Sequence, residues 1–176
     1  MDAEPRAHHQ LSAGLPDGAF VTDGLLTKRA LRAYALAMLE PRGDQRLWDL
    51  GAGTGSIGSE WCRLHPGNTV VAVERRAERT ERIESNARVH GVSGQVQVVV
   101  GDLAEVLPAL PAPDAVFVGG GVTYELIERC WGLLPSAGRL VAHSVTADSD
   151  TVLLRAYQQW GGELARIGVE QAEPIG

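Results

Sequence analysis

The chain has 176 residues, of which 44% are hydrophobic and 22% charged, and its formal net charge is −6. A chain of this length is expected to form one domain whose core buries roughly 70% of the unfolded surface. The acidic balance argues against a nucleic-acid partner. No apolar run approaches the roughly 20 residues that cross a bilayer, and the polar residues 1–10 lack a signal-peptide core. We therefore expect a cytoplasmic protein with no membrane contact.

Residues 1–13 are expected to form a flexible lead, followed by a single domain over residues 14–176. Apolar residues at helical spacing predict helices at residues 30–39, 56–64, 78–90, 124–134 and 151–160, with a shorter helical turn at 103–110. Short apolar runs predict strands at residues 47–50, 69–73, 96–100, 115–118 and 139–145, with 164–169 as a candidate sixth strand.

Strands and helices alternate along the domain, and each connection between strands is long enough to hold a helix. This pattern predicts an α/β fold with a doubly wound, mostly parallel, Rossmann-like sheet covered by helices on both faces. Ligands bind such sheets beyond the carboxyl ends of the strands. Residues that follow a strand are therefore the first candidates for a functional site.

The two cysteines, Cys62 and Cys130, lie far apart and in no paired motif. Free cysteine is often buried and behaves as a small apolar side chain. We therefore expect two reduced core thiols, and neither a disulfide nor a metal site.

Unusual groups follow four successive predicted strands. The first is the loop Gly51-Ala52-Gly53-Thr54-Gly55, the next two are the acids Glu74 and Asp102, and the fourth is the triple glycine at 119–121. Glycines let backbone amides approach a ligand, and the following helix favours an anion at its N-terminus. An acid after the second strand can accept from two ribose hydroxyls, and one after the third from an adenine amino group. A single strand-end acid is more often solvated or a helix cap, so the argument depends on all four together.

Two cofactors fit this arrangement. Gly53-x-Gly55-x-x-Gly58 satisfies the dinucleotide fingerprint, with Glu74 about 20 residues beyond its start. Alternatively, Asp49 precedes the loop to give Asp-x-Gly-x-Gly-x-Gly, which resembles class I S-adenosylmethionine-dependent methyltransferases. A dinucleotide would need a second mononucleotide unit, for which the sequence shows no clear glycine turn. S-adenosylmethionine is therefore the favoured cofactor, with S-adenosylhomocysteine as its product.

The N-terminal blocks Gly14-Leu15-Pro16-Asp17-x-x-Phe20 and Leu26-Thr27-Lys28, followed by a helix, resemble the decarboxylating precorrin methyltransferases of cobalamin biosynthesis. In particular they are similar to the C15-methylating type, which occurs alone or as the C-terminal half of a fused precorrin-6Y C5,15-methyltransferase. Residues 48–55, 100–107 and 114–120 agree with the same family. The resemblance extends from residue 14 to the C-terminus.

The resemblance implies methyl transfer to ring carbon 15 of a precorrin, with loss of carbon dioxide from the acetate on ring C. It also implies that the cofactor contacts Thr27, Gly51, Ala52, Gly53, Thr54, Gly55, Glu74, Asp102 and Leu103. Thr27 has an equally good structural interpretation as a helix N-cap. The family further implies a homo-oligomer, a tetramer, and a domain methylating C5 that is fused to or paired with this one. No catalytic residue is named.

The sequence departs from the family in three places. The glycine-serine loop after the fourth strand is shortened to residues 119–122, His143 replaces an Asn or similar small polar residue, and the given sequence ends before a final strand that the family pairs antiparallel with the sixth. His143 is interpreted either as a neighbour of the substrate or as a partly buried, hydrogen-bonded side chain. The substrate is rich in carboxylates, and its candidate partners are Lys28, Arg29, Arg75, Arg76, Arg129 and Arg139, most of which we expect to be solvated.

Three alternatives remain at this point. An RNA or protein methyltransferase would share the cofactor site but need a basic groove. A non-catalytic module would bind S-adenosylmethionine as an assembly partner. A dinucleotide oxidoreductase ranks third.

Overall fold

The computed structural model describes residues 12–170 and 172, so most of the expected lead over 1–13 lies outside the described residues. Five parallel strands form one sheet in the order β3-β2-β1-β4-β5. The strands are β1 (Arg46–Leu50), β2 (Thr69–Glu74), β3 (Val96–Val100), β4 (Ala115–Val118) and β5 (Arg139–Ala142). The order reverses between β1 and β4, and this switch point is where parallel sheets bind ligands.

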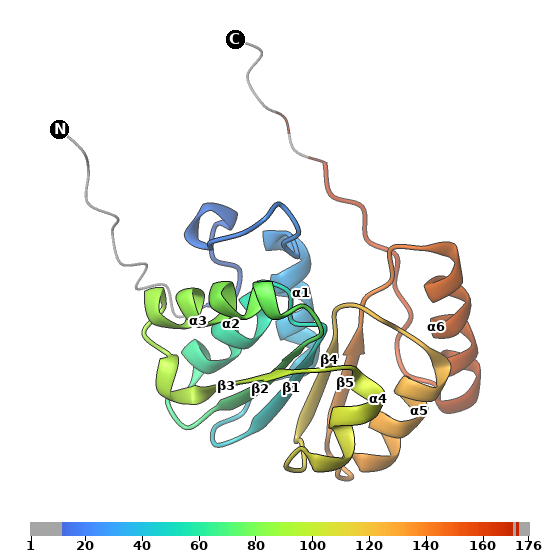
Figure 1. Ribbon diagram of the computed structural model, residues 1–176. Coiled ribbons are helices and arrows are strands. Elements are labelled where there is room, and N and C mark those ends of the chain that lie inside the picture. Colours follow the sequence, from blue (N-terminus) through green and yellow to red (C-terminus); the bar gives the residue numbers. More distant parts are fainter. Residues whose placement is uncertain (1–11, 171, 173–176) are drawn as a thin grey trace, which may run out of the picture.

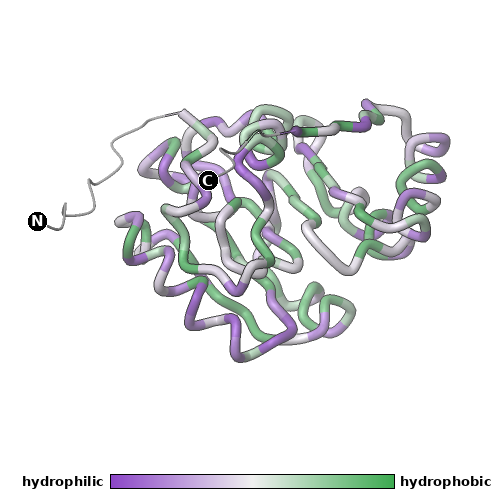
Figure 2. Tube along the Cα trace, turned by 90° about the horizontal axis from the view of Figure 1, so that it is seen from above, coloured by the Kyte–Doolittle hydropathy of each residue, from purple (hydrophilic) through white to green (hydrophobic). Residues whose placement is uncertain are grey.

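Helices cover both faces of the sheet, with α1 to α3 on one side and α4 to α6 on the other (Figure 1). They are α1 (Arg29–Leu39), α2 (Ser56–Leu64), α3 (Thr80–Val89), α4 (Leu103–Val106), α5 (Tyr124–Leu133) and α6 (Ala147–Trp160). Short 3₁₀ turns lie at Asp17–Ala19, Ala77–Arg79, Ser93–Gln95 and Leu107–Ala109. Green and purple alternate along the helices in Figure 2, as expected for helices with one face against a sheet.

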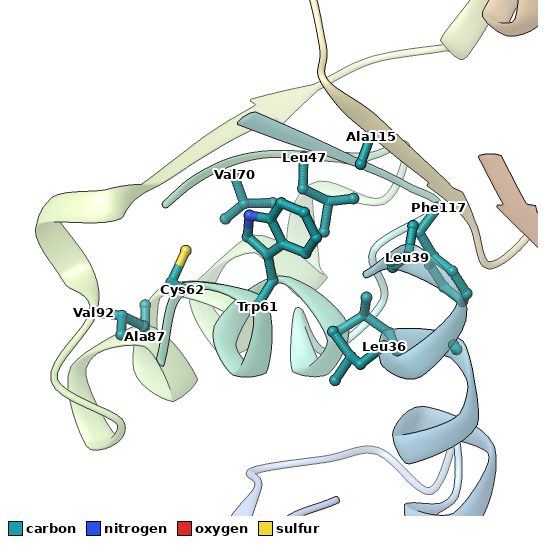
Figure 3. Close-up of a cluster of buried hydrophobic side chains, with 12 residues drawn as sticks. Leu36, Leu39, Leu47, Trp61, Cys62, Val70, Ala87, Val92, Ala115 and Phe117 are labelled. Atoms are coloured by element: carbon teal, nitrogen blue, oxygen red, sulfur yellow. The ribbon is translucent and has the colours of Figure 1, made fainter. Parts of the chain in front are cut away.

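Two hydrophobic cores lie on opposite faces of the sheet because successive strand residues point to opposite sides. On the α1 to α3 side, Trp61 of α2 is fully buried beside Leu47 and Val70 (Figure 3). On the other side, Trp48 and Leu50 of β1 pack under α5 and α6 with the side chains of β2 and β4. A sheet buried on both faces explains the continuous apolar runs in β2 and β4, whereas β1 also carries Asp49.

The predicted α/β fold is confirmed, and the larger differences from the predicted elements lie after residue 138. Helix α6 begins at Ala147 because Thr146 forms a capping box with Ser149, and β5 ends at Ala142. The candidate sixth strand at residues 164–169 is wrong, since residues 161–170 contain no strand. Gly161 and Gly162, both with positive φ, follow the last residue of α6. In the segment after them, Arg166 forms an ion pair with Asp150 of α6 at 2.9 Å.

The cysteine prediction is confirmed for burial: Cys62 and Cys130 are both free and almost fully buried. Burial raises the pKa of the Cys62 thiol to about 12 and that of Cys130 to about 11. Both are therefore protonated packing residues. In the described part of the chain, no helix is both long and apolar enough to cross a membrane.

Residues 14–28 form a segment that we call the strap, which runs beside α1 at the top of Figure 1. Leu15, Phe20 and Leu26 of the strap make a small hydrophobic cluster separate from the two main cores. The strap lacks regular structure apart from one 3₁₀ turn, so its position must be set by side-chain contacts with the helices.

A buried ion pair holds the first part of the strap. Arg32 of α1 is fully buried, and its Nε donates to Glu60 Oε1 of α2 at 2.8 Å. The same guanidinium donates to Asp17 Oδ1 at 2.7 Å and to the carbonyl of Leu15, while Glu60 accepts from the amide of Gly14. Removing one member of such a pair leaves a buried charge unpaired, at a cost of about 3–5 kcal/mol.

Candidate functional site

A pocket of about 910 Å³ lies beyond the carboxyl ends of the strands, between the strap and the loops after β1 to β5. It is lined by every sequence-predicted site residue except Gly55, namely Thr27, Gly51, Ala52, Gly53, Thr54, Glu74, Asp102 and Leu103. The topology thus brings together residues that are up to 76 positions apart, from Thr27 to Leu103. Sequence reasoning missed most of the strap's contribution, which includes Gly24, Leu25 and Leu26.

The glycine loop after β1 passes very close to the loop after β4. The amides of Gly51 and Ala52 both donate to the carbonyl of Val73, at 2.9 and 3.0 Å, so the chain turns sharply out of the strand. Gly51 has φ +72°, and a Cβ there would lie 3.0–3.2 Å from the backbone of Gly120. Only glycine both adopts this φ readily and leaves room for the backbone of Gly120, which explains why a glycine occupies position 51 beside the switch point of the sheet.

Gly55 differs from the prediction because it does not line the pocket. It is the N-cap of α2 with φ +69°, and a Cβ there would lie 2.8 Å from Cγ2 of Ile83 in α3. Its role in the structure is to let α3 pack against the loop. The sequence pattern could not separate a glycine that faces a ligand from one that faces a helix.

Glu74 at the end of β2 is held in place by two backbone amides. Its Oε2 accepts from Gly53 and its Oε1 from Arg76, both at 2.9 Å, and the residue is 6% exposed. A carboxylate has about four acceptor positions, so two backbone donors leave capacity for ligand hydroxyls. The first bond also fixes the middle of the glycine loop against β2.

Asp49 is a buried acid beneath the same loop. It is 1% exposed, and its Oδ2 accepts from the amide of Gly58 in the first turn of α2 at 3.1 Å. Burial, with a smaller contribution from the charge of Glu74, raises the pKa of Asp49 to about 7. A cationic ligand group in the pocket would favour the ionised form.

The remaining predicted contacts, Asp102 and Thr27, both line the pocket. Asp102 is exposed and caps α4, accepting from the amide of Ala104 at 2.9 Å, so its structural interpretation as a cap holds. One oxygen of that carboxylate makes the cap, and the carboxylate still borders the pocket. Thr27 is not the helix N-cap; that position belongs to Lys28, which makes no side-chain cap.

His143 after β5 also lines the pocket, and its ring meets the ring of Phe117 edge-on, with centroids 5.0 Å apart. Burial lowers the pKa of His143, which favours the neutral imidazole. His143 is thus partly buried and lines the pocket, and a place beside the substrate stays a prediction.

The candidate cations divide into two groups. Four of them line the pocket: Lys28, Arg75, Arg76 and Arg129. Arg29 and Arg139 do not, because Arg29 donates to the carbonyl of Gly14 and Arg139 pairs with Glu40 at 2.6 Å. Arg79 is a further lining cation that the sequence did not indicate, and it pairs with Asp23 of the strap at 3.2 Å. Among the described residues, no cluster of side chains suited to a metal ion is present.

A parallel sheet in this order, with a glycine loop after β1 and acids after β2 and β3 around one pocket, has the architecture of a Rossmann-like class I methyltransferase domain. A family model described as a precorrin methyltransferase domain matches residues 18–176. The chain belongs to this family.

Two curated proteins and one solved structure illustrate the relationship. The precorrin-6Y C(5,15)-methyltransferase (decarboxylating) of Mycobacterium tuberculosis is 46% identical over 162 residues, which are 92% of this chain and 41% of that protein. A probable cobalt-precorrin-6B C(15)-methyltransferase (decarboxylating) of Pyrobaculum aerophilum is 31% identical, over 93% of this chain and 87% of that protein.

The crystal structure of the C-terminal domain of precorrin-6Y C5,15-methyltransferase from Rhodobacter capsulatus matches with a TM-score of 0.88 and 41% identity. The match covers 95% of this chain and 90% of that domain. This chain spans about two fifths of the length of the Mycobacterium relative.

Proposed function

We propose that this chain uses S-adenosylmethionine to methylate carbon 15 of a precorrin and promotes loss of carbon dioxide from the ring C acetate, as a step of cobalamin biosynthesis. The observation that carries the proposal is the single pocket that joins the glycine loop, Glu74 and Asp102 to the open space at residues 119–121. Membership of the precorrin methyltransferase domain family supports the same acceptor.

The cofactor site in this proposal uses the residues predicted from the sequence. The backbone of Gly51 to Thr54 borders the methionine part, Glu74 accepts from the ribose hydroxyls, and Asp102 with Leu103 borders the adenine. Thr27 contributes from the strap, and Gly55 acts indirectly by packing on α3. The buried Asp49 carboxylate lies under the loop and stabilises positive charge.

The acceptor lies on the side of the pocket near β4 and β5. Bare backbone at Gly120, where a Cβ would meet no atom within 4 Å, leaves room for a bulky planar molecule, and the Phe117 and His143 rings provide a partly apolar wall. Lys28 and Arg129 border the pocket and can pair with carboxylates of the substrate.

The reaction requires mainly that the protein align the methyl donor with the acceptor carbon. When bound, S-adenosylmethionine supplies a methyl group activated by the positive charge on its sulfur. At the acceptor, ring carbon 15 gains the methyl group, and loss of carbon dioxide returns an electron pair to the conjugated macrocycle. Holding the reacting atoms in line is worth roughly 7–11 kcal/mol, which the strap and the glycine loop can contribute by enclosing the pocket.

The test is transfer of the methyl group from isotopically labelled S-adenosylmethionine to a precorrin, with carbon dioxide measured in parallel. The proposal expects one labelled methyl and one carbon dioxide per turnover. Tight binding of S-adenosylhomocysteine without turnover would support the non-catalytic module instead. Labelling of RNA or protein but not precorrin would favour the other methyltransferase class, and binding of NAD alone would overturn the cofactor.

We also propose that the chain works as a cytoplasmic homo-oligomer, a tetramer, together with a domain that methylates C5. The greater length of the Mycobacterium relative supports a second domain. Exposed apolar side chains on α5 and α6, including Trp131, Leu154 and Tyr157, offer a surface for self-association. Light scattering on the purified protein tests the tetramer, and cell fractionation tests the location.

A further inference from the structure

One buried amide connects the strap to the glycine loop. Asn86 of α3 is fully buried, although no part of it lines the pocket. Its Oδ1 accepts from the amide of Val21 at 2.8 Å, and its Nδ2 donates to the carbonyl of Val21 at 3.0 Å. The same Nδ2 donates to the carbonyl of Thr54 at 2.9 Å. Asn86 thus bonds the strap and the glycine loop through one side chain.

The place of these bonds matters because each segment continues directly into the pocket wall. Three residues after Val21, the strap begins to line the pocket at Gly24, and Thr54 itself lines it. A Cβ at Gly53 would lie 4.0 Å from the carbonyl oxygen of Leu25, so the strap and the loop face each other across a narrow gap.

The other anchors of the strap hold it against the helical layer rather than against the glycine loop. The Arg32 and Glu60 pair holds residues 14–17, which do not line the pocket, and Arg32 also donates to the carbonyl of Thr27, which does. Asp23 pairs with Arg79 and Arg82, but these are partly exposed side chains of the sort that contribute little to rigidity. Asn86 is a fully buried anchor that bonds both the strap and the glycine loop.

We propose that Asn86 is a positioning residue for the cofactor: its amide sets the separation of the strap from the glycine loop, and thereby preorganises the site for S-adenosylmethionine. This inference rests on the proposed cofactor function. Preorganisation lowers the cost of ordering two segments on binding, so its loss weakens cofactor binding more than it slows the chemical step.

The matched pair of variants is Asn86→Asp and Asn68→Asp. Asn86→Asp preserves the size of the side chain but replaces the donor to Val21 and Thr54 by an oxygen. Asn68 is equally buried and bonds Gln45 and Trp61, but it precedes β2 at the opposite end of the sheet. Both variants lose buried hydrogen bonds, so both lower the melting temperature.

The readouts are the Kd for S-adenosylhomocysteine by calorimetry, and KM for S-adenosylmethionine against kcat. For Asn86→Asp we expect Kd and KM to rise about tenfold with kcat within about twofold, as loss of one hydrogen bond's worth of preorganisation would give. For Asn68→Asp we expect wild-type values of all three. An unchanged Kd in Asn86→Asp, or an equal rise in both variants, would overturn the inference.

A second variant covers the case in which Asn86→Asp does not fold. Val21→Pro removes the strap's donor to Asn86 without changing α3, and the extended backbone of Phe20 before it is compatible with proline. The inference expects the same rise in Kd, and a wild-type Kd contradicts it. If wild-type protein itself fails to bind S-adenosylhomocysteine, the proposed function fails, which is a different result.

Discussion

Buried polar groups at the two ends of the sheet have different kinds of hydrogen-bond partner. At the amino ends of the strands, the Gln95 side chain donates to the carbonyls of Cys62, His65 and Asn68 at 2.7–3.3 Å and closes that end with protein contacts. At the carboxyl ends, the Asp49 and Glu74 carboxylates are almost fully buried but are met by backbone amides rather than by cationic side chains. The first end is complete in itself, whereas the second is built for a ligand with hydroxyl and cationic groups.

A variant at Gly51 is expected to have the largest effect at the ligand-binding end of the sheet. Gly51→Val introduces a β-branched residue at φ +72° and places its Cβ against the backbone of Gly120. We expect affinity for S-adenosylhomocysteine to fall by about 100-fold or more, and stability to fall by about 1–3 kcal/mol. Calorimetry and urea unfolding measure the two. Gly94→Ala at the amino end, where a Cβ meets open space, should change neither.

Glu74 tests the ribose contact at the pocket end. Glu74→Gln removes the charge and one acceptor oxygen, so one of the two backbone amides at Gly53 and Arg76 faces an NH₂ group. We expect affinity for S-adenosylhomocysteine to fall about 10–100-fold, since bonds to charged groups are worth about 1.5–3 kcal/mol. Glu40→Gln, an exposed acid paired with Arg139, is the control. Wild-type affinity in Glu74→Gln would contradict the assigned role.

A variant at Gln95, at the amino ends of the strands, is expected to lower stability without changing ligand affinity. Gln95→Leu leaves the carbonyls at the end of α2 and before β2 without their side-chain donor. We expect stability in urea unfolding to fall by about 1–3 kcal/mol, with the Kd for S-adenosylhomocysteine unchanged. A higher Kd in Gln95→Leu would show that the two ends of the sheet are energetically coupled.

Asp49 gives the smallest effect, a dependence of cofactor affinity on pH. Because its pKa is raised to about 7, the carboxylate becomes ionised as pH rises from 6 to 8. Affinity for cationic S-adenosylmethionine should rise a few-fold across that range, and less for the neutral sulfur of S-adenosylhomocysteine. Asp49→Asn should flatten the difference between the two ligands. An identical pH profile in the variant would exclude Asp49 as the group responsible.

The same pKa has a consequence for stability with a definite sign. The unfolded carboxyl titrates near 3.8, so between about pH 4 and 7 the folded protein holds a proton that the unfolded chain has lost. Stability relative to Asp49→Asn should therefore fall as pH rises through this window and level off above it. Urea unfolding of both proteins at several pH values measures the difference.

Much of the fold could be predicted because its signals are local. Continuous apolar runs define β2 and β4, and glycine and proline end the helices, as Gly91 does after α3 with φ +70°. The sixth strand could not be predicted correctly, because pairing depends on a neighbouring edge and not only on composition. Residues 164–169 have enough apolar side chains, but they are exposed and pair with no strand.

The site shows the same division. The glycine loop and the strand-end acids follow from strand-to-turn patterns within a few residues, so the sequence by itself determined the kind of cofactor to expect. The sequence could not reveal that Gly55 faces Ile83, or that Asn86 bonds to Val21 at a separation of 65 residues. Those relationships join segments that carry no local signal for each other. Only the tertiary structure decided them, since packing of α3 brings the strap and the loop to one amide.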